Sequence, residues 1–112
     1  MLVEMISWED FENIGLRVGT IVKVGDFPEA KKPTYKLEID LGELGIKKSS
    51  ARITELYSKE DLLGRQVICV TNFPPKQIGP FISEVLTTGF YTDEGVVLAQ
   101  PESKVKNGSK LA

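Results

Sequence analysis

The stretch IGLRVGTIVKVGDFPEA, residues 14–30, contains the longest alternating pattern in the chain. Alternation with a period of two is typical of an extended strand, whose successive side chains point to opposite faces. One face would carry Leu16, Val18, Thr20, Val22 and Val24, and the other Arg17, Gly19, Ile21, Lys23 and Gly25. Because glycine tolerates bending, the stretch predicts a long, kinked first strand followed by a proline-containing turn.

Further strand-like and helix-like runs follow this one. Tyr35, Leu37, Ile39 and Leu41 alternate with polar residues and predict the clearest strand of the chain. Other strands are expected at 46–53 after a turn at 42–45, at 66–71, at 83–91 and at 96–100 around a turn at 92–95. Short helices are expected after the N-cap Ser7 and between residues 54 and 64, and a polar tail with an Asn107-Gly108 turn after Pro101.

This layout predicts an all-β protein. About five strands, the first long and kinked, with a small helix between the third and fourth, fit a five-stranded Greek-key barrel of the oligonucleotide/oligosaccharide-binding (OB) fold with short helices. Six strand-like runs also fit a sandwich. At 112 residues, the chain is expected to be a single domain spanning 1–112.

The composition excludes several kinds of site. The chain has no histidine and a single cysteine, Cys69, which lies in an apolar run and is expected to be buried and inert. A catalytic triad, a disulfide and a thiolate zinc site are therefore not expected, and neither a metal nor a cofactor is predicted. No apolar run approaches the ~20 residues of a membrane span, and the acidic N-terminal residues do not resemble a signal peptide. We expect a cytoplasmic protein that is not an enzyme.

The net charge of −2 conceals a segregation along the sequence. Residues 1–13 carry four acidic and no basic residues, whereas residues 31–52 have a net charge of +3 and residues 65–81 a net charge of +2. A basic face that binds phosphate depends on local potential more than on net charge. These lysines could equally form an ordinary solvated surface.

Three stretches resemble a known family. IGLRVGTIVKVGDFPEA (14–30), YKLEIDLG (35–42) and NFPPKQIGPFISEVL (72–86) are similar to the tRNA-binding domain that occurs as a free homodimer and appended to some methionyl- and phenylalanyl-tRNA synthetases. The form Asn-Phe-Pro-Pro-basic followed by Phe-x-Ser-Glu-Val-Leu resembles the CsaA branch, the secretion-associated chaperone-like proteins. The resemblance implies an OB fold, a homodimer, recognition of tRNA by its structure and, in this branch, affinity for unfolded preproteins.

The resemblance also implies contact residues for tRNA. Lys47 matches a basic position on the third strand, Asn72 the asparagine of the proline loop, Ser83 the serine of the family's Ser-x-Gly-Met motif, and Lys76 the basic position after Pro-Pro. Lys48 and Arg52 could extend the basic surface. The chain departs from the wider family at Gln77, Gly79-Pro80 and Val85-Leu86, although Val-Leu is normal in the CsaA branch.

Four aromatic residues are candidates for a peptide-binding or dimer surface. Trp8 and Phe11 form one apolar edge of the first helix, which could pack on its own barrel or on a partner subunit. Phe73 and Phe81 flank the proline loop. If exposed, they could stack on unpaired bases or hold a peptide; if buried, they would anchor the loop or the dimer.

Overall fold

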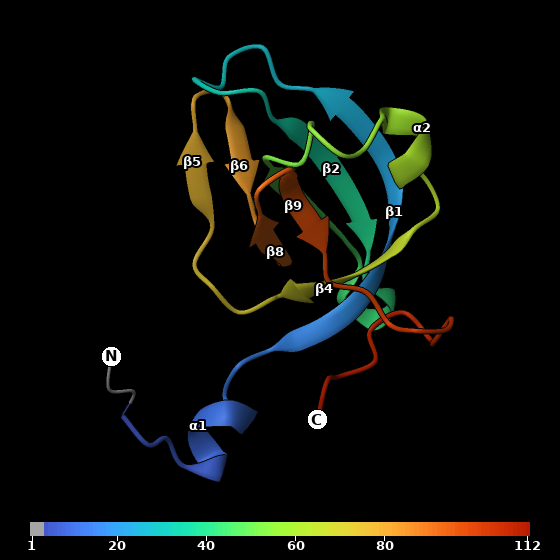
Figure 1. The fold of residues 1–112 in the computed structure, drawn as a ribbon. Helices are drawn as coiled ribbons and strands as arrows, with labels where there is room; N and C mark the ends of the chain where they lie inside the picture. The colour runs from blue at the N-terminus through green and yellow to red at the C-terminus, as the bar shows by residue number, and fades with distance from the viewer. Residues whose placement is uncertain (1–3) are drawn as a thin grey trace.

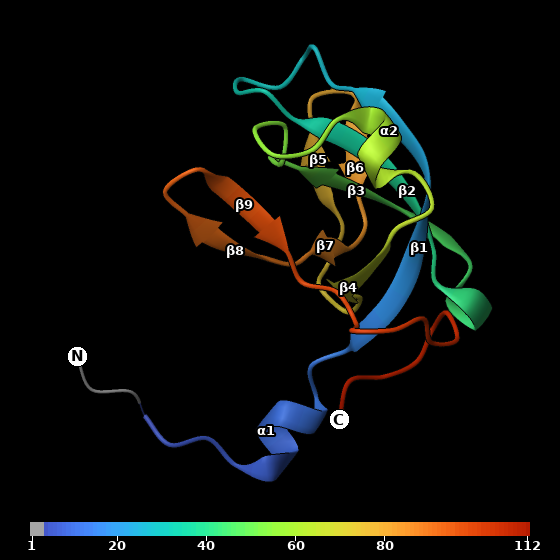
Figure 2. The same ribbon diagram turned by 45° about the vertical axis from the view of Figure 1, so that its right-hand side comes forward.

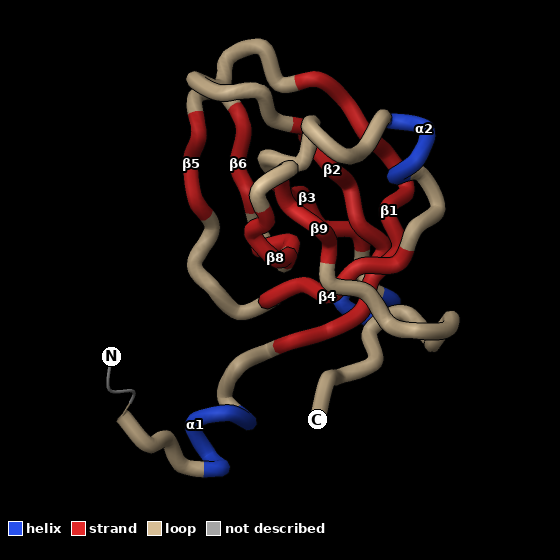
Figure 3. Tube along the Cα trace, in the orientation of Figure 1, coloured by secondary structure: helices blue, strands red, loops and turns tan. Residues whose placement is uncertain are grey.

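The computed structural model describes residues 4–112 and has a barrel at its centre (Figures 1 and 3). Five antiparallel strands are ordered β3-β2-β1-β4-β7. Their bounds are β1 (Leu16–Asp26), β2 (Tyr35–Asp40), β3 (Ile46–Ala51), β4 (Gln66–Val70) and β7 (Leu86–Thr87). The predicted fold class is confirmed: a barrel of OB type with short helices.

Short polar contacts bring the two edges of this sheet together. The backbone oxygen of Lys48 in β3 accepts hydrogen bonds from the backbone N–H groups of Glu84 and Val85, just before β7. The hydroxyl groups of Ser49 and Thr87 lie 2.8 Å apart, and Ser49 is fully buried. Because the closing strand β7 is only two residues long, the seam between β3 and β7 depends on these contacts as much as on strand pairing.

The barrel interior is filled by aliphatic side chains. The prediction for β2 is confirmed, since Leu37, Ile39 and the adjoining Leu41 are buried, and the half-buried Tyr35 packs against them. The largest fully buried side chains also include Ile21, Leu62 and Val67. Cys69 is buried among them, as expected.

The alternation predicted for β1 is wrong in its second half. Its pairing with β2 shifts register between Ile21 and Lys23, which marks a β-bulge. The extra residue reverses the inward and outward sets: Ile21 is fully buried, whereas Val22 is exposed and Val24 packs against the core. The bulge lies where β1 changes its partner from β4 to β2.

Two small hairpins occupy the segment after β4. The proline-rich run contains the hairpin of β5 (Lys76–Ile78) and β6 (Phe81–Ser83), which turns at Gly79, a residue with a φ of +56°. The single strand predicted over 83–91 is divided into β7 and β8 (Gly89–Thr92). The latter pairs with β9 (Gly95–Leu98) as a separate two-stranded sheet.

The helices are short. α1 (Trp8–Glu12) and α2 (Lys59–Leu62) both begin with a capping box, in which Ser7 and Ser58 exchange hydrogen bonds with Asp10 and Asp61. A 3₁₀ turn, η1 (Gly42–Leu44), joins β2 to β3. No helix within residues 4–112 has the length and apolar character needed to cross a membrane.

The C-terminal segment 105–111 lies against β1 (Figure 2). Val18 donates its N–H to Ser109 and accepts one from Gly108, and Leu111 donates to Leu16. Arg17 donates from its guanidinium to the backbone oxygen of Gly108 over 2.8 Å. The predicted polar tail is thus an ordered part of the barrel wall.

Candidate nucleic-acid interface

Lys47 and Lys48 lie on opposite faces of β3. Lys47 is opposite the buried Ile39 in β2, so it belongs to the inner side of the barrel near the start of the strand, where it is half-buried. Lys48 is opposite Glu38 on the outer side and is exposed. Arg52 follows the end of β3 and is also exposed. The three cations are neighbours in sequence but do not form one face.

The hairpin of β5 and β6 brings Lys76 and Ser83 to the edge of β3. The two residues are opposite each other in the hairpin. The Ser83 hydroxyl accepts a hydrogen bond from the Ser50 backbone N–H over 3.2 Å and is 3.4 Å from the Val85 oxygen. Ser83 therefore positions the hairpin, whereas the exposed Lys76 is available to a ligand.

Asn72 connects the proline loop to the segment between α1 and β1. Its Oδ1 accepts from the Gly15 N–H over 2.8 Å, and its Nδ2 donates to the Asn13 oxygen over 2.7 Å. One amide hydrogen remains for other partners. The structure thus gives Asn72 a positioning role at the base of α1, away from the contacts between the hairpin and β3.

A groove lies on the outer face of the barrel between the sheet and Phe81. Its volume is about 330 Å³. It is lined by Lys23, Gly25, Asp26, Lys36, Leu37, Glu38, Lys48 and Phe81. Residues on β1, β2 and β3 form two cross-strand rows here, Lys23-Glu38-Lys48 and Gly25-Lys36-Ser50. Of the predicted site residues, only Lys48 and Phe81 line the groove.

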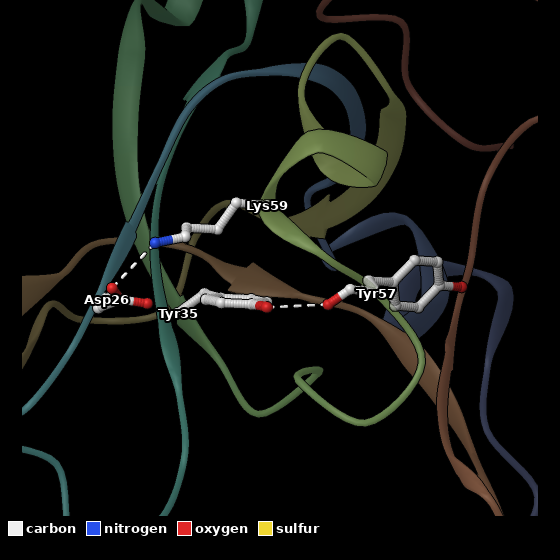
Figure 4. A network of polar contacts seen from close by, with 4 residues as sticks. All are labelled: Asp26, Tyr35, Tyr57 and Lys59. Atoms are coloured by element: carbon white, nitrogen blue, oxygen red, sulfur yellow. Dashed lines mark hydrogen bonds and ion pairs between the residues drawn. The ribbon is translucent and has the colours of Figure 1, made fainter.

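Both carboxylates of the groove already have cationic partners. Glu38 lies 3.6 Å from the Lys23 ammonium, and Asp26 lies 2.9 Å from that of Lys59 in α2 (Figure 4). The hydrogen bond to Asp26 raises the pKa of Lys59 above its ordinary value. Within residues 4–112, neither Lys36 nor Lys48 forms an ion pair. Two ammonium groups of the groove are therefore free to meet an anion.

Two aromatic rings pack against each other at the groove. Phe27 is buried and meets Phe81 edge-on, with 5.3 Å between ring centroids. The Lys36 ammonium lies 5.6 Å from the centroid of the Phe27 ring, a cation–π contact that holds the lysine near the sheet without neutralising it. In the neighbouring network, the Tyr35 hydroxyl donates to the Tyr57 oxygen over 2.9 Å and so ties β2 to the segment before α2 (Figure 4).

The aromatic candidates divide into two regions. Trp8 is 72% exposed and contacts the half-buried Phe11 on α1. Phe73 is 56% exposed and follows Asn72, which is bonded to the end of this helix. Phe81 belongs instead to the groove. Neither α1 aromatic is buried in the chain's own barrel.

Two further exposed aromatic residues were missed in the sequence. Phe90 is 64% and Tyr91 is 94% exposed on β8. The signal that could have found them is the absence of charge in Gly89–Thr92, next to a turn rich in acids. Edge strands are normally protected by charged side chains, and Gly89–Thr92 carries none.

The described residues hold no candidate metal centre. Among residues 4–112, no three histidine, cysteine or acidic side chains are grouped in a way that could bind an ion. The Cys69 thiol is equally unsuited, because burial raises its pKa to about 12.

Comparisons with known proteins cover nearly the whole chain. The family described as "Putative tRNA binding domain" matches residues 16–110. The crystal structure of the CsaA chaperone protein from Picrophilus torridus is similar, with a TM-score of 0.91 and 50% identity over 96% of this chain and 100% of that one. Chaperone CsaA from Bacillus anthracis gives a TM-score of 0.90 and 47% identity over 97% and 100%.

Longer proteins also contain a segment that is similar to this chain. The methionine–tRNA ligase of Thermococcus onnurineus is 37% identical over 109 residues. The match covers 97% of this chain but only 15% of the ligase.

Proposed function

Because this chain belongs to the tRNA-binding-domain family and, within it, to the CsaA branch, we propose that it binds tRNA by structure and acts as a homodimer with chaperone-like activity. The observation that carries the proposal is the family match over residues 16–110. We further propose that the protein is cytoplasmic and has no catalytic activity of its own, in line with its lack of histidine.

The exposure of three basic residues near β3 supports tRNA binding. Lys48, Arg52 and Lys76 are exposed on β3, just after it and on the hairpin at its edge, and Lys47 is half-buried in the same strand. Flexible lysines meet phosphates without reading the sequence, which suits recognition of a folded RNA by its shape. Ser83 would contribute to tRNA binding by positioning the β5–β6 hairpin, and Asn72 by positioning the loop after β4.

Filter binding of total tRNA at low and moderate salt tests this proposal. We expect retention that decreases with salt and exceeds that of duplex DNA. Lys47→Glu should weaken tRNA binding about tenfold, because it replaces an attraction to phosphate by a repulsion. Lys47→Gln removes the charge without reversing it and so separates a loss of binding from a folding defect. Lys104→Glu, which makes the same change in a separate cleft with Gln66 and Pro101, is the matched control. Salt-independent retention or equal retention of duplex DNA would contradict a tRNA site.

Homodimerisation is supported by exposed apolar residues on two parts of the chain. In Figure 2, the hairpin of β8 and β9 projects to the left of the barrel, and α1 lies below it. They carry the exposed aromatic residues Trp8, Phe90 and Tyr91. A second copy related by a two-fold axis would cover the same residues on both chains. Sedimentation equilibrium should give a dimer, and a monomer at micromolar concentration would contradict this part of the proposal.

A second candidate function is the binding of unfolded preproteins, with RNA binding secondary. The exposed aromatic residues favour it, because an apolar surface can hold an extended segment of a client. The purified protein should suppress aggregation of a denatured client, and Phe73→Ala should reduce this effect while leaving tRNA binding unchanged. Lys47→Glu should have the reverse pattern. Failure both to suppress aggregation and to bind apolar peptides would exclude this function.

A further inference from the structure

We propose that Asn107 is a site of covalent modification, at which the side-chain amide is hydrolysed when the C-terminal segment 105–111 leaves β1. One of the two products then prevents the segment from docking again. The reaction is deamidation at an asparagine–glycine pair, with water as co-reactant and ammonia as leaving group. This inference goes beyond the proposed function and does not depend on the binding of RNA or of a client protein.

The sequence makes Asn107 the most reactive asparagine of the chain. Asparagine is among the thermolabile residues of proteins. Of the three asparagines, Asn13 precedes an isoleucine, Asn72 precedes a phenylalanine, and only Asn107 precedes a glycine. Because glycine has no side chain, nothing shields its backbone nitrogen, and the chain can adopt the conformation needed for attack. The other two asparagines therefore serve as references within the same molecule.

The reaction uses only groups of Asn107 and Gly108 together with water. The backbone nitrogen of Gly108 loses its proton to solvent and forms a bond to Cγ of Asn107. The bond from Cγ to Nδ2 breaks, and this nitrogen takes up a proton and leaves as ammonia, which gives a cyclic imide. Water then opens the ring at either carbonyl carbon. Opening at the backbone carbonyl gives isoaspartate, and opening at Cγ gives aspartate.

In the folded protein, hydrogen bonds restrain both reacting groups. The N–H of Gly108, whose proton must be lost, is donated to the Val18 oxygen over 2.7 Å. The Oδ1 of Asn107 accepts from the Thr20 hydroxyl over 2.8 Å and from the Gln66 amide over 3.0 Å. These two donors also polarise the amide carbon, so protection depends on the bond between Gly108 and Val18. We infer that deamidation requires local opening of the segment.

The two products differ in their ability to dock. An aspartate at position 107 keeps an oxygen for the same two donors. An isoaspartate adds a methylene group to the backbone, and the fold leaves little room for it. A Cβ at Gly42 would collide with the backbone oxygen of Asn107, and one at Gly108 would lie 2.8 Å from the Leu41 oxygen. The isoaspartate form should therefore stay undocked and also lose the segment's bond to the end of α1.

The first experiment compares deamidation rates in the folded chain and in the chain unfolded by guanidinium. Cleavage after glutamate releases residues 103–112, and mass spectrometry with chromatography separates asparagine, aspartate and isoaspartate at position 107. We expect Asn107 to react at least about tenfold more slowly in the folded protein. In the unfolded chain, Asn107 should react faster than Asn13 and Asn72. Equal rates at Asn107 in the two states would overturn the inference.

A variant that loosens the segment without altering the reacting amide tests the role of opening. Arg17→Leu removes the bond from the guanidinium to the Gly108 oxygen, which measures 2.8 Å. Deamidation should become about fivefold faster, because losing one hydrogen bond raises the open population by about that factor. Arg52→Leu, the same change at an exposed position after β3, should react as wild type does. A wild-type rate in Arg17→Leu would contradict control by opening.

Hydrogen exchange gives a measure that needs no variant and stays informative if Arg17→Leu does not fold. In guanidinium below the unfolding transition, exchange at the Gly108 N–H, followed by NMR, and deamidation of wild type should increase together. Deamidation that increases without exchange would overturn the inference.

The products are tested on aged protein. The fraction with isoaspartate at position 107, separated by chromatography, should show at least about tenfold faster exchange at the N–H groups of Val18 and Leu111, which the segment's bonds protect in wild type. Asn107→Asp is the matched control and should keep this protection. Full protection in the isoaspartate fraction would show that the modification does not prevent docking.

Discussion

Asn72, which the resemblance suggests as an RNA contact, also forms hydrogen bonds within its own chain. Both its amide oxygen and its amide nitrogen are bonded to backbone groups between α1 and β1. A polar residue in a loop can be identified from the sequence, but its partners, 57 and 59 residues away, cannot. Ser83 is a similar case, since its hydroxyl meets Ser50 across a seam that no local pattern encodes.

We predict that Asn72→Ala loosens the base of α1. Loss of two hydrogen bonds at an exposed site should lower the free energy of unfolding by about 1 kcal/mol and speed hydrogen exchange at Gly15. Asn72→Asp, which keeps the acceptor for Gly15, should retain more of the protection. Exchange can be followed by NMR. A large loss of tRNA affinity with unchanged exchange at Gly15 would instead indicate a direct contact with RNA.

Cys69 is predicted to make the fold sensitive to alkaline pH. Its pKa is raised by burial from 9.0 to about 12, so its thiol stays neutral in the folded protein while the unfolded chain ionises. The stabilising effect is complete below about pH 9 and is lost as the pH rises towards 12. Denaturant unfolding across this range should show a steeper decline for wild type than for Cys69→Ala. Parallel curves would contradict the prediction.

At the scale of elements, the alternation of apolar and polar residues predicts a strand well when the strand keeps the same neighbouring strand on each side along its whole length. β2 is flanked by β1 and β3 along its whole length, and its alternation is correct. β1 changes partner partway, and the bulge after Ile21 reverses its faces. This bulge follows from the closure of the barrel, because a strand that passes between the two parts of a barrel must bend sharply.

The division of the 83–91 run has the same origin. Thr88 donates from its backbone to Ile68 in β4 and accepts from Ala99, so the chain passes from the barrel into a second hairpin at this point. An uninterrupted strand-like pattern in the sequence does not reveal where the chain passes from one sheet to another. The groove could not be predicted from the sequence either, because only the strand register brings Lys23, Lys36 and Lys48 to one face of the sheet.

The β8–β9 hairpin provides a prediction at this scale. Phe90→Thr and Tyr91→Thr keep good strand residues but remove exposed aromatic surface, so the monomer's stability should change by no more than about 0.5 kcal/mol. If the hairpin lies in the dimer interface, both substitutions should raise the dimer dissociation constant in sedimentation equilibrium. Leu98→Ala, at a buried position of the same hairpin, should instead cost about 2–5 kcal/mol of stability. Unchanged association in both surface variants would place the interface elsewhere.

At the scale of the whole molecule, the C-terminal segment completes the barrel wall. Residues 105–111 add backbone bonds to β1 and side-chain bonds from Thr20 and Gln66 to Asn107. Lys110 also donates to the Glu12 oxygen over 2.9 Å, so this segment touches the end of α1. The sequence predicts only a polar tail here. The segment is held to β1 through backbone hydrogen bonds, and such pairing needs no regular alternation of apolar residues.

Deletion of residues 105–112 is therefore predicted to destabilise the entire barrel. It removes several hydrogen bonds to β1 and Gln66, each worth about 1 kcal/mol. The midpoint of thermal unfolding, measured by circular dichroism, should fall by more than about 10 °C. Deletion of Ala112 alone is the control and should have little effect. An unchanged midpoint in the longer deletion would show that the segment contributes no stability.

Both described ends of the chain leave the barrel at the same pole. In Figures 1 and 2, α1 and the C-terminus lie below the barrel, whereas the tips of β5 and β6 and the 27–34 loop lie at the opposite end. A tether or an additional polypeptide joined to either end would extend away from the Phe27–Phe81 contact and leave the groove beside it unobstructed. The geometry suits a portable unit that can be attached through either terminus and still leave the same groove accessible.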